Sequence, residues 1–262
     1  MGRVVVVGSV QQRVVVDVLR IPAAGETATS LRTRRSLGGR GMLQAVAARR
    51  AGADVAMVAA IGDDETGRWC RERLVRAGIT PRLQVVAAES TGQAIVARED
   101  GDRDAVILIP GADAALDSRT ALDDTAPDDV VLIQLDVPPA VVADVLREAD
   151  RRQLRVVVNA SPYATVDPEA AALCDPFVVG ERDAALLADV GVMPRSLCVT
   201  FGRAGAVWDG LRMDSDDLGS PALAPGGTEA FCGTLAATLA AGSDRPEALR
   251  AAVAAAGNVE DD

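Results

Sequence analysis

The stretch VVLIQLDVPPAVVADVLREADRRQLRVVVN, residues 130–159, has the pattern of a strand, a helix and a second strand. Its two ends are short apolar runs, Val130–Leu135 and Arg155–Asn159, and the segment between them, Pro139–Arg151, is predicted to be helical. Continuous apolar runs of this length are typical of parallel strands that are buried on both faces. Because strands and helices alternate here, the stretch predicts an α/β fold.

The same alternation extends towards both ends of the chain. The apolar runs Val4–Val7 and Val55–Ile61 are predicted to be buried strands. Further strands and helices are expected over Gly41–Arg50, Thr66–Ala77, Phe177–Val179, Glu181–Ala188, Leu197–Thr200, Ala206–Trp208, Thr228–Ala241 and Arg245–Ala256. Asp63 and Asp64 precede the second helix of the chain and are typical N-cap residues. Together these elements predict a doubly wound sheet.

Two ribbon-like segments do not fit this sheet. Val14–Leu31 has mixed polarity and is interrupted by a proline and a glycine. Gln93–Arg98 and Ala105–Ile109 flank Asp100–Gly101, a dipeptide typical of hairpin turns. We expect these segments to pair outside the large sheet as a small β-lid, formed by about residues 12–36 and 84–110.

The composition excludes several classes of protein. The 262 residues carry a net charge of −11 at pH 7, which argues against nucleic acid or an anionic membrane as a partner. The chain contains neither histidine nor lysine, which excludes Ser-His-Asp and Cys-His hydrolases, histidine-ligated metals and the Walker-type phosphate loop. Carboxylate, arginine, hydroxyl, thiol and backbone N–H groups remain. They suffice for phosphoryl transfer, in which positioning and electrostatics do most of the work.

We expect a single domain over residues 1–262 and a cytoplasmic location. No apolar run reaches the ~20 residues that span a bilayer, and the strand-like run at Val4 argues against a signal peptide. The cysteines form no CxxC pair and are expected to be reduced and mostly buried: Cys70, Cys174, Cys198 and Cys232.

A second informative stretch is PGGTEAFCG, Pro225–Gly233, at the start of an apolar helix. Free backbone N–H groups and the positive end of the helix dipole bind anions such as phosphate. Gly226, Gly227 and Thr228 therefore form a candidate anion hole, and Glu229 a candidate base that takes a proton from an attacking hydroxyl. The structural alternatives are an ordinary turn at the glycines and a glutamate that only offsets the dipole.

Gly38, Gly39 and Gly41 form a glycine cluster before the first predicted helix. They either make a tight entry from strand to helix or let the backbone approach a substrate closely. Three glycines in four residues exceed what a turn needs, which favours close approach to a substrate.

Over nearly its whole length the chain resembles the ribokinase, or phosphofructokinase-B (PfkB), family of carbohydrate kinases. The resemblance rests on ten segments in order: GSVQQR (Gly8–Arg13), PAAGET (Pro22–Thr27), GGRGMLQAVAA (Gly38–Ala48), IGDDETG (Ile61–Gly67), STGQA (Ser90–Ala94), GADAAL (Gly111–Leu116), QLDVP (Gln134–Pro138), NASP (Asn159–Pro162), VTFGRAGA (Val199–Ala206) and GGTEAFCGTLAA (Gly226–Ala237). It implies a mostly parallel sheet flanked by helices, a β-lid over the substrate, and ATP with Mg²⁺ at the far end of the cleft.

The resemblance also assigns roles by position in the matched motifs. The residues implied in substrate binding are Gln11, Arg13, Gly39, Arg40, Gly41 and Leu43. Thr200, Gly202 and Gly205 are implied in nucleotide binding, and Gly226–Glu229 in catalysis. Asp183 is either a water-mediated magnesium residue or an ordinary solvated helix residue.

This chain departs from the family pattern at the site. Arg13 and Gln11 stand where the family has Asp and Asn, and Arg40 and Leu43 where it has Lys and Asn. Glu229 replaces the family's aspartate base, and its extra methylene changes the reach of the carboxylate. The segment after Asp183 is shorter by a helix and the sequence ends at Asp262, so we expect weaker contact with adenine.

Two function hypotheses follow. The first is an ATP-dependent kinase that phosphorylates a hydroxyl group of a small sugar, sugar acid or nucleoside-like molecule. If Arg13 and Arg40 point into its pocket rather than lie on the surface, an anionic ligand is preferred. The second is a catalytically silent relative that binds a small ligand or a partner protein. A dinucleotide-dependent oxidoreductase is disfavoured, because no GxGxxG follows the first strand. A homodimer through the β-lid and a monomer are both open.

Overall fold

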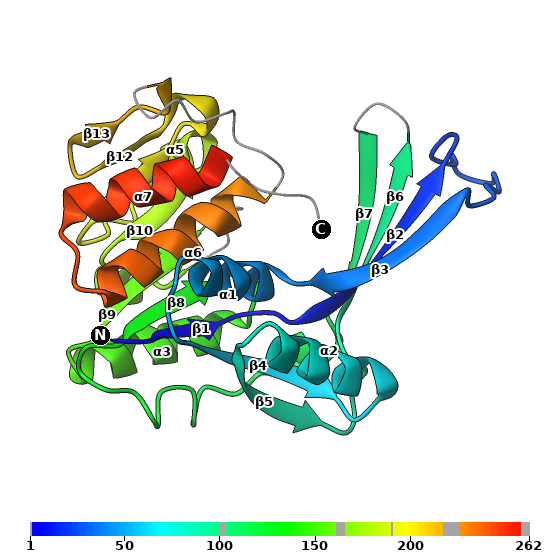
Figure 1. Ribbon diagram of the computed structural model, residues 1–262, viewed down its shortest axis with the longest axis horizontal. Coiled ribbons are helices and arrows are strands. Elements are labelled where there is room, and N and C mark those ends of the chain that lie inside the picture. The colour runs from blue at the N-terminus through cyan, green and yellow to red at the C-terminus, as the bar shows by residue number, and fades with distance from the viewer. Residues whose placement is uncertain (1, 100–102, 161–165, 190, 217–225, 258–262) are drawn as a thin grey trace.

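The computed structural model of the protein describes residues 2–99, 103–160, 166–189, 191–216 and 226–257, and a large twisted sheet runs through its centre (Figure 1). The strands of this sheet are β1 (Val4–Val7), β4 (Val55–Gly62), β5 (Thr80–Val86), β8 (Val130–Gln134), β9 (Arg155–Asn159), β10 (Phe177–Gly180), β11 (Leu197–Thr200), β12 (Ala206–Trp208) and β13 (Leu211–Met213). Their order is β13-β12-β11-β10-β9-β8-β1-β4-β5. All neighbours from β11 to β5 pair in parallel, and β12 and β13 are added in antiparallel pairing.

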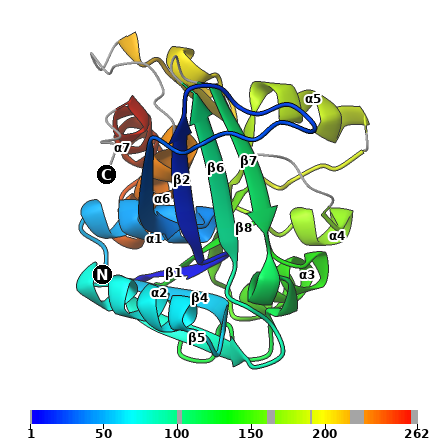
Figure 2. The same ribbon diagram turned by 90° about the vertical axis from the view of Figure 1, so that its right-hand side faces the viewer.

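Helices cover both faces of this sheet, which confirms the predicted α/β class (Figures 1 and 2). They are α1 (Arg40–Arg50), α2 (Glu65–Arg76), α3 (Pro139–Arg151), α4 (Pro168–Ala171), α5 (Glu181–Asp189), α6 (Gly227–Ala240) and α7 (Arg245–Gly257), with short 3₁₀ turns η1 (Gly111–Ala115) and η2 (Gly202–Ala204). One hydrophobic core lies under α1, α2, α6 and α7, and a second lies under α3, α4 and η1.

The valine run of β1 explains why both faces need cover. Val4 and Val6 belong to the first core, Val5 and Val7 to the second, and all four are fully buried. Successive strand residues point to opposite faces, so an uninterrupted apolar run has no side left for water. On α6, Phe231, Leu235 and Leu239 recur every four residues and so share one face, which is buried.

A second sheet projects from one edge of the first, as Figures 1 and 2 show. Its strands are β2 (Gln11–Val18), β3 (Arg32–Gly38), β6 (Gln93–Glu99) and β7 (Arg103–Ile109), in the order β3-β2-β6-β7. The predicted hairpin is confirmed, because β6 and β7 pair in antiparallel fashion. Its turn at Asp100–Gly101 lies outside the described residues.

The lid boundary predicted at residue 84 was wrong. Gln84, Val85 and Val86 belong to β5, which pairs in parallel with β4 in the large sheet. β5 is the edge strand of that sheet, so its sequence TPRLQVV alternates in polarity instead of forming a continuous apolar run. The lid strands themselves begin at Gln93 in this half of the chain.

Glycines bring α1 against its neighbours. A Cβ atom on Gly41 would lie 2.7 Å from the Cα of Gly8, and one on Gly233 of α6 would lie 2.4 Å from the carbonyl oxygen of Gln44. These contacts are closer than any side chain allows, so glycine lets the helix backbones approach directly. As a result, the N-terminal ends of α1 and α6 are held at the same edge of the sheet.

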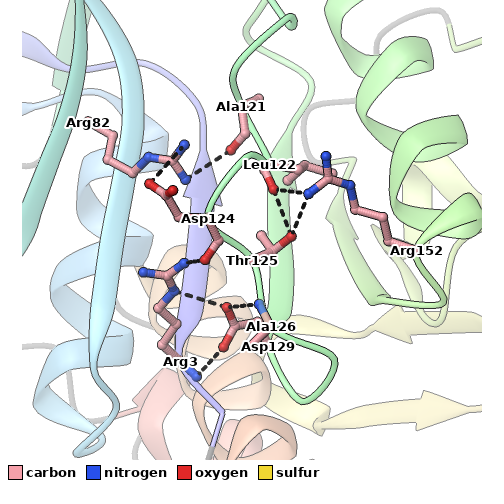
Figure 3. Close-up of polar contacts among 9 residues, drawn as sticks. All are labelled: Arg3, Arg82, Ala121, Leu122, Asp124, Thr125, Ala126, Asp129 and Arg152. Atoms are coloured by element: carbon pink, nitrogen blue, oxygen red, sulfur yellow. Dashed lines mark hydrogen bonds and ion pairs between the residues drawn. The ribbon is translucent and has the colours of Figure 1, made fainter.

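Three arginines hold the segment that leads into β8 (Figure 3). Arg3 donates from its backbone and Nε to the buried carboxylate of Asp129, at 2.9 Å in each case. Arg82 donates to the carbonyl oxygens of Thr120 and Ala121, and Arg152 to that of Leu122. This network fixes β8 beside β1, because Arg3 and Asp129 directly precede these strands.

Two further predictions are tested by the described residues. Cys70, Cys174, Cys198 and Cys232 are buried and free, as expected. Burial raises the pKa of the Cys70 and Cys198 thiols to about 12, so they stay protonated at neutral pH. Within the described ranges, no helix has the length and apolar character that crossing a membrane requires.

Candidate active site

A cavity of about 1520 Å³ opens between the lid and the carboxyl ends of β1 and β8. Ser9 and Asp136 follow those strand ends, Gln11 and Arg13 come from the lid, and Arg40 and Glu229 come from the first turns of α1 and α6. The crevice outside the carboxyl ends of parallel strands is where α/β sheets bind ligands. The location therefore marks this cavity as the candidate active site.

Ser9 connects three parts of the cavity wall. Its hydroxyl donates to Asp136, its backbone N–H also donates to that carboxylate at 3.3 Å, and its Oγ accepts from the backbone N–H of Arg40 at 3.1 Å. Asp136 is open to solvent on its cavity side, but the surrounding protein desolvates its carboxyl group and so raises its pKa. The hydrogen bonds from Ser9 oppose this shift. The network fixes the start of α1 relative to both strand ends.

Asp113, in η1, is a buried carboxyl group of the cavity whose pKa is strongly raised. It is buried, accepts from the backbone N–H of Val10 at 3.2 Å, and accepts from Nε2 of Gln11 at 2.9 Å. Burial raises its pKa to about 7, because desolvation penalises the charged form more than these two hydrogen bonds stabilise it. Asp113 thus holds Gln11 in place and titrates near neutral pH.

Arg40 and Glu229 form an ion pair across the cavity. Nη1 of Arg40 lies 2.6 Å from Oε1 of Glu229, and the side chain of Glu229 is buried while that of Arg40 is 41% exposed. The two residues are 189 positions apart in the sequence. The pair joins the first turn of α1 to the first turn of α6.

The start of α6 has the features of an anion site. Gly226 is the N-cap residue in the left-handed conformation, with φ 85°, and no side chain among the described residues caps the helix. Helix starts leave backbone N–H groups without intrahelical partners, and the dipole adds positive potential there. These residues fit the phosphate groups of a nucleotide.

A second, smaller pocket lies on the other side of this helix start. It is lined by Thr200, Gly202 and Gly205, together with Ser215, Phe231 and the end of α7. Thr228 lines both this pocket and the large cavity. The two spaces therefore meet at the first turn of α6, where Glu229 also lies.

Most of the residues singled out from the sequence meet at these two spaces. Those that line the large cavity are Gln11, Arg13, Gly39, Arg40, Leu43, Asp183, Gly226, Thr228 and Glu229. Thr200, Gly202 and Gly205 line the smaller pocket. Gly227 and Gly41 are buried and line neither space.

Gly39 and Gly41 each have a structural reason to be glycine, and the close approach to a substrate that the sequence favoured stays a prediction. Gly39 has φ 91°, and a Cβ on it would lie 2.5 Å from the carbonyl oxygen of Ser9, while Gly41 packs on Gly8. The glycines are needed for close approach to the chain's own backbone, which is the tight strand–helix entry that was the alternative. Asp64 is likewise structural: it caps α2 and accepts from the backbone and hydroxyl of Thr91.

Sequence analysis assigned no role to Ser9, Asp113 or Asp136, which all line the cavity. Asp136 comes two residues after the end of β8, and the rule that ligands bind beyond the carboxyl ends of parallel strands would have found it. Asp113 had no such signal, because it lies in a short turn after a lid strand. Both carboxylates were already present in two of the matched motifs, QLDVP and GADAAL.

Comparison with known proteins agrees with this geometry. Residues 1–191 match the pfkB family carbohydrate kinase family. The chain is 28% identical to the ribokinase of Bacillus subtilis over 271 residues, which covers 98% of this chain and 92% of that protein. It is 31% identical to the ribokinase of Haemophilus influenzae over 191 residues, which covers 71% of this chain but only 62% of that protein.

Solved structures show the same fold. The ribokinase of Thermotoga maritima superposes with a TM-score of 0.85 at 22% identity, covering 98% of this chain and 92% of that one. The ribokinase of Arabidopsis thaliana, solved with ribose and ATP, gives a TM-score of 0.83 at 21% identity with the same coverage. The chain belongs to the pfkB family of carbohydrate kinases, a family of phosphotransferases, and the predicted ribokinase-like fold is confirmed.

Proposed function

We propose that the protein transfers the γ-phosphoryl group of ATP to a hydroxyl group of a small sugar, sugar acid or nucleoside-like molecule. One observation carries the proposal: a buried carboxylate, Glu229, lies in the first turn of a helix that no described side chain caps, at the junction of two spaces. The large cavity would hold the acceptor, and the nucleotide phosphates would bind at the helix start between the two spaces, since the smaller pocket, at about 10 Å³, cannot enclose a nucleotide. ATP, when bound, supplies the phosphoryl group. The chain's own residues would bind and orient the nucleotide and the acceptor, and would accept the proton of the hydroxyl group.

The nucleotide phosphates would bind at the start of α6. The backbone N–H groups of Gly226, Gly227 and Thr228 would hold a phosphoryl oxygen, because the helix start offers donors and positive potential. Thr200, Gly202 and Gly205 would line the nucleotide side. Magnesium would enter bound to the phosphates, with Asp183 touching it through water, since no group of three acidic, cysteine or histidine ligands occurs among the described residues.

The acceptor would lie in the large cavity. Gln11 and Arg13 from the lid, with Gly39, Arg40 and Leu43 at the start of α1, would contact it. Glu229 would accept the proton of the attacking hydroxyl as the acceptor oxygen bonds to phosphorus. Gln11 is held for this role by Asp113, and α1 by Ser9.

The test is a direct assay for ADP. The protein is incubated with ATP, magnesium and a panel of pentoses, hexoses, sugar acids and nucleosides, and ADP release above the acceptor-free rate is measured. The proposal predicts acceptor-dependent ADP release with at least one compound and a phosphorylated product by mass spectrometry. Binding of an acceptor without any ADP release would instead support the catalytically silent alternative.

We further propose that a second copy of the chain packs on the lid, and that the protein works in the cytoplasm. The outer face and edge strand of the lid expose Ile107 and Ile109, at 62% and 38%. Exposed aliphatic side chains on an edge strand favour association. Sedimentation analysis should show a dimer that Ile107→Asp converts to monomer; a wild-type monomer contradicts this.

The cytoplasmic location is supported by ATP use and by four free cysteines.

A further inference from the structure

The wall of the large cavity has the opposite charge balance from the rest of the protein. The chain as a whole has 38 acidic and 27 basic residues. Among the described residues, eight arginines line the cavity against four carboxylates, Asp113, Asp136, Asp183 and Glu229; four of these arginines, Arg13, Arg35, Arg40 and Arg98, are near the lid. Such a local reversal of sign raises the concentration of anions at the cavity mouth.

Arg13 is placed to bind an anion inside the cavity. It lies on β2 opposite Ser36 and Ala94, on the lid face that also carries Val96 and Leu108. Its side chain is half-buried, and among the described residues it has no hydrogen-bond or ion-pair partner. Its charge acts on Asp104, but that carboxylate is already held at 3.0 Å by both Nε and Nη2 of Arg98. A half-buried guanidinium in such surroundings favours a bidentate anionic partner.

Arg40 reaches the cavity from the opposite side. Its guanidinium is partly exposed and holds Oε1 of Glu229 at 2.6 Å. The same contact turns the carboxylate of Glu229 towards α1 and occupies one of its oxygens. An anionic group in the cavity would compete for Arg40, because guanidinium binds carboxylate and phosphate oxygens in the same geometry.

From these contacts we propose that the acceptor carries a carboxylate or phosphate group that binds Arg13 and Arg40, and that this binding releases Glu229 to act as the base. The inference rests on the proposed function. In the reaction, the acceptor oxygen would form a bond to phosphorus as the bond to ADP breaks, and the hydroxyl proton would pass to the carboxylate of Glu229. A neutral polyol leaves Arg40 on Glu229 and is used poorly.

The first test measures binding without turnover. Calorimetry compares D-ribose, D-ribonate and α-D-ribose 1-phosphate, which are neutral, carboxylated and phosphorylated and all keep the 5-hydroxyl group. At least one anion should bind about tenfold more tightly than ribose, and added salt should narrow the difference. Arg13→Gln should remove the preference. Arg32→Gln is the matched control: Arg32 is exposed on the lid and does not line the cavity, so the preference should persist.

The inference is overturned if ribose binds as tightly as both anions, if neither anion binds at millimolar concentration, or if Arg13→Gln leaves the preference intact.

The second test measures turnover by wild type and Arg40→Gln. Loss of the ion pair should lower kcat with the anion and raise kcat with ribose, so that the ratio of the two falls about tenfold or more. An unchanged ratio contradicts the release of Glu229. If anions bind preferentially but no acceptor gives ADP release, the proposed function is contradicted. The claim that the cavity binds an anionic ligand through Arg13 would still hold.

Discussion

Gly41 of α1 packs directly on Gly8 at the end of β1, so closely that a Cβ atom on Gly41 would lie 2.7 Å from the Gly8 Cα. This contact sets where α1 begins, and therefore where Arg40 points. With Gly233 against Gln44, it holds the first turns of α1 and α6 near enough for Arg40 to reach Glu229. The geometry of the cavity thus depends on backbone packing behind it.

Gly41→Ala should destabilise the protein and weaken acceptor binding together. The added methyl group has no space, and overpacking of a tight contact costs about 1–3 kcal/mol of unfolding free energy. Denaturant unfolding measures the loss, and calorimetry measures acceptor affinity. Leu43→Ala, on the same helix but 40% exposed, is the stability control. An unfolding midpoint for Gly41→Ala equal to that of wild type would show that α1 shifts freely.

Asp113→Asn should change the pH dependence of stability. The pKa of Asp113 is raised to about 7 in the fold from an ordinary value of 3.8, so between these values the folded protein binds more protons than the unfolded chain. Its contribution to stability is therefore present below about pH 4 and is lost as pH rises towards 7. Asparagine does not titrate.

Thermal unfolding of wild type and Asp113→Asn at several pH values between 5 and 8 tests this directly. The difference in Tm, variant minus wild type, should become more positive as pH rises. Each kcal/mol of unfolding free energy that the wild type loses corresponds to a few degrees of Tm. Asp136 also lies near Asp113 and raises its pKa, so Asp136→Asn should reduce the effect. A Tm difference independent of pH would mean that Asp113 stays ionised across this range.

Asp129→Ala should cost more stability than any surface change in the same loop. Asp129 is buried and accepts from the backbone and Nε of Arg3 and from the backbone of Ala126. Removing it leaves the guanidinium of Arg3 with the carbonyl oxygen of Asp124 but no carboxylate, and breaking a buried pair costs about 3–5 kcal/mol. The neighbouring Asp128→Ala, at an exposed position, should be close to neutral. Equal unfolding free energies for the two variants would refute a structural role for the network in Figure 3.

The sequence predicted the parts of this molecule that are governed by local pattern. The apolar runs of β1, β4, β8 and β9 and the helices between them were found because strands buried on both faces have no polar positions. β5 was missed because an edge strand carries polar residues such as Arg82 and Gln84. Residue types at the site were found only through the motifs that the family shares.

Contacts between distant residues were not predictable in this way. Nothing local to Arg40 or Glu229 indicates that they pair over 189 positions, since the contact depends on how α1 and α6 pack through Gly233. The same holds for Asp113, whose pKa depends on burial beneath the lid. The backbone contacts of Gly39 and Gly41 were not predictable either, because a glycine's requirement comes from the atoms opposite it, which the sequence does not show.

Glu229→Asp shortens the side chain at position 229 and keeps its negative charge, so it tests whether side-chain length limits the rate. Aspartate keeps the carboxylate but is one methylene shorter, so it should lose the contact with Nη1 of Arg40 that Glu229 makes at 2.6 Å. With a neutral acceptor, we expect kcat to rise relative to wild type, because the base is no longer held; steady-state kinetics with ribose measures it. A kcat lowered about 100-fold would show instead that the longer side chain is needed to place the carboxylate.

The most direct test of the account is the rate of ADP release by Glu229→Gln, measured beside wild type with ATP, magnesium and the best acceptor of the panel. Glutamine keeps the size and still accepts a hydrogen bond from Arg40, but it cannot take the proton of the attacking hydroxyl. The account predicts a fall in kcat of about 10²–10⁴-fold in a variant that still folds and still binds the acceptor. A rate equal to that of wild type would contradict it, because the base would then be a residue other than Glu229.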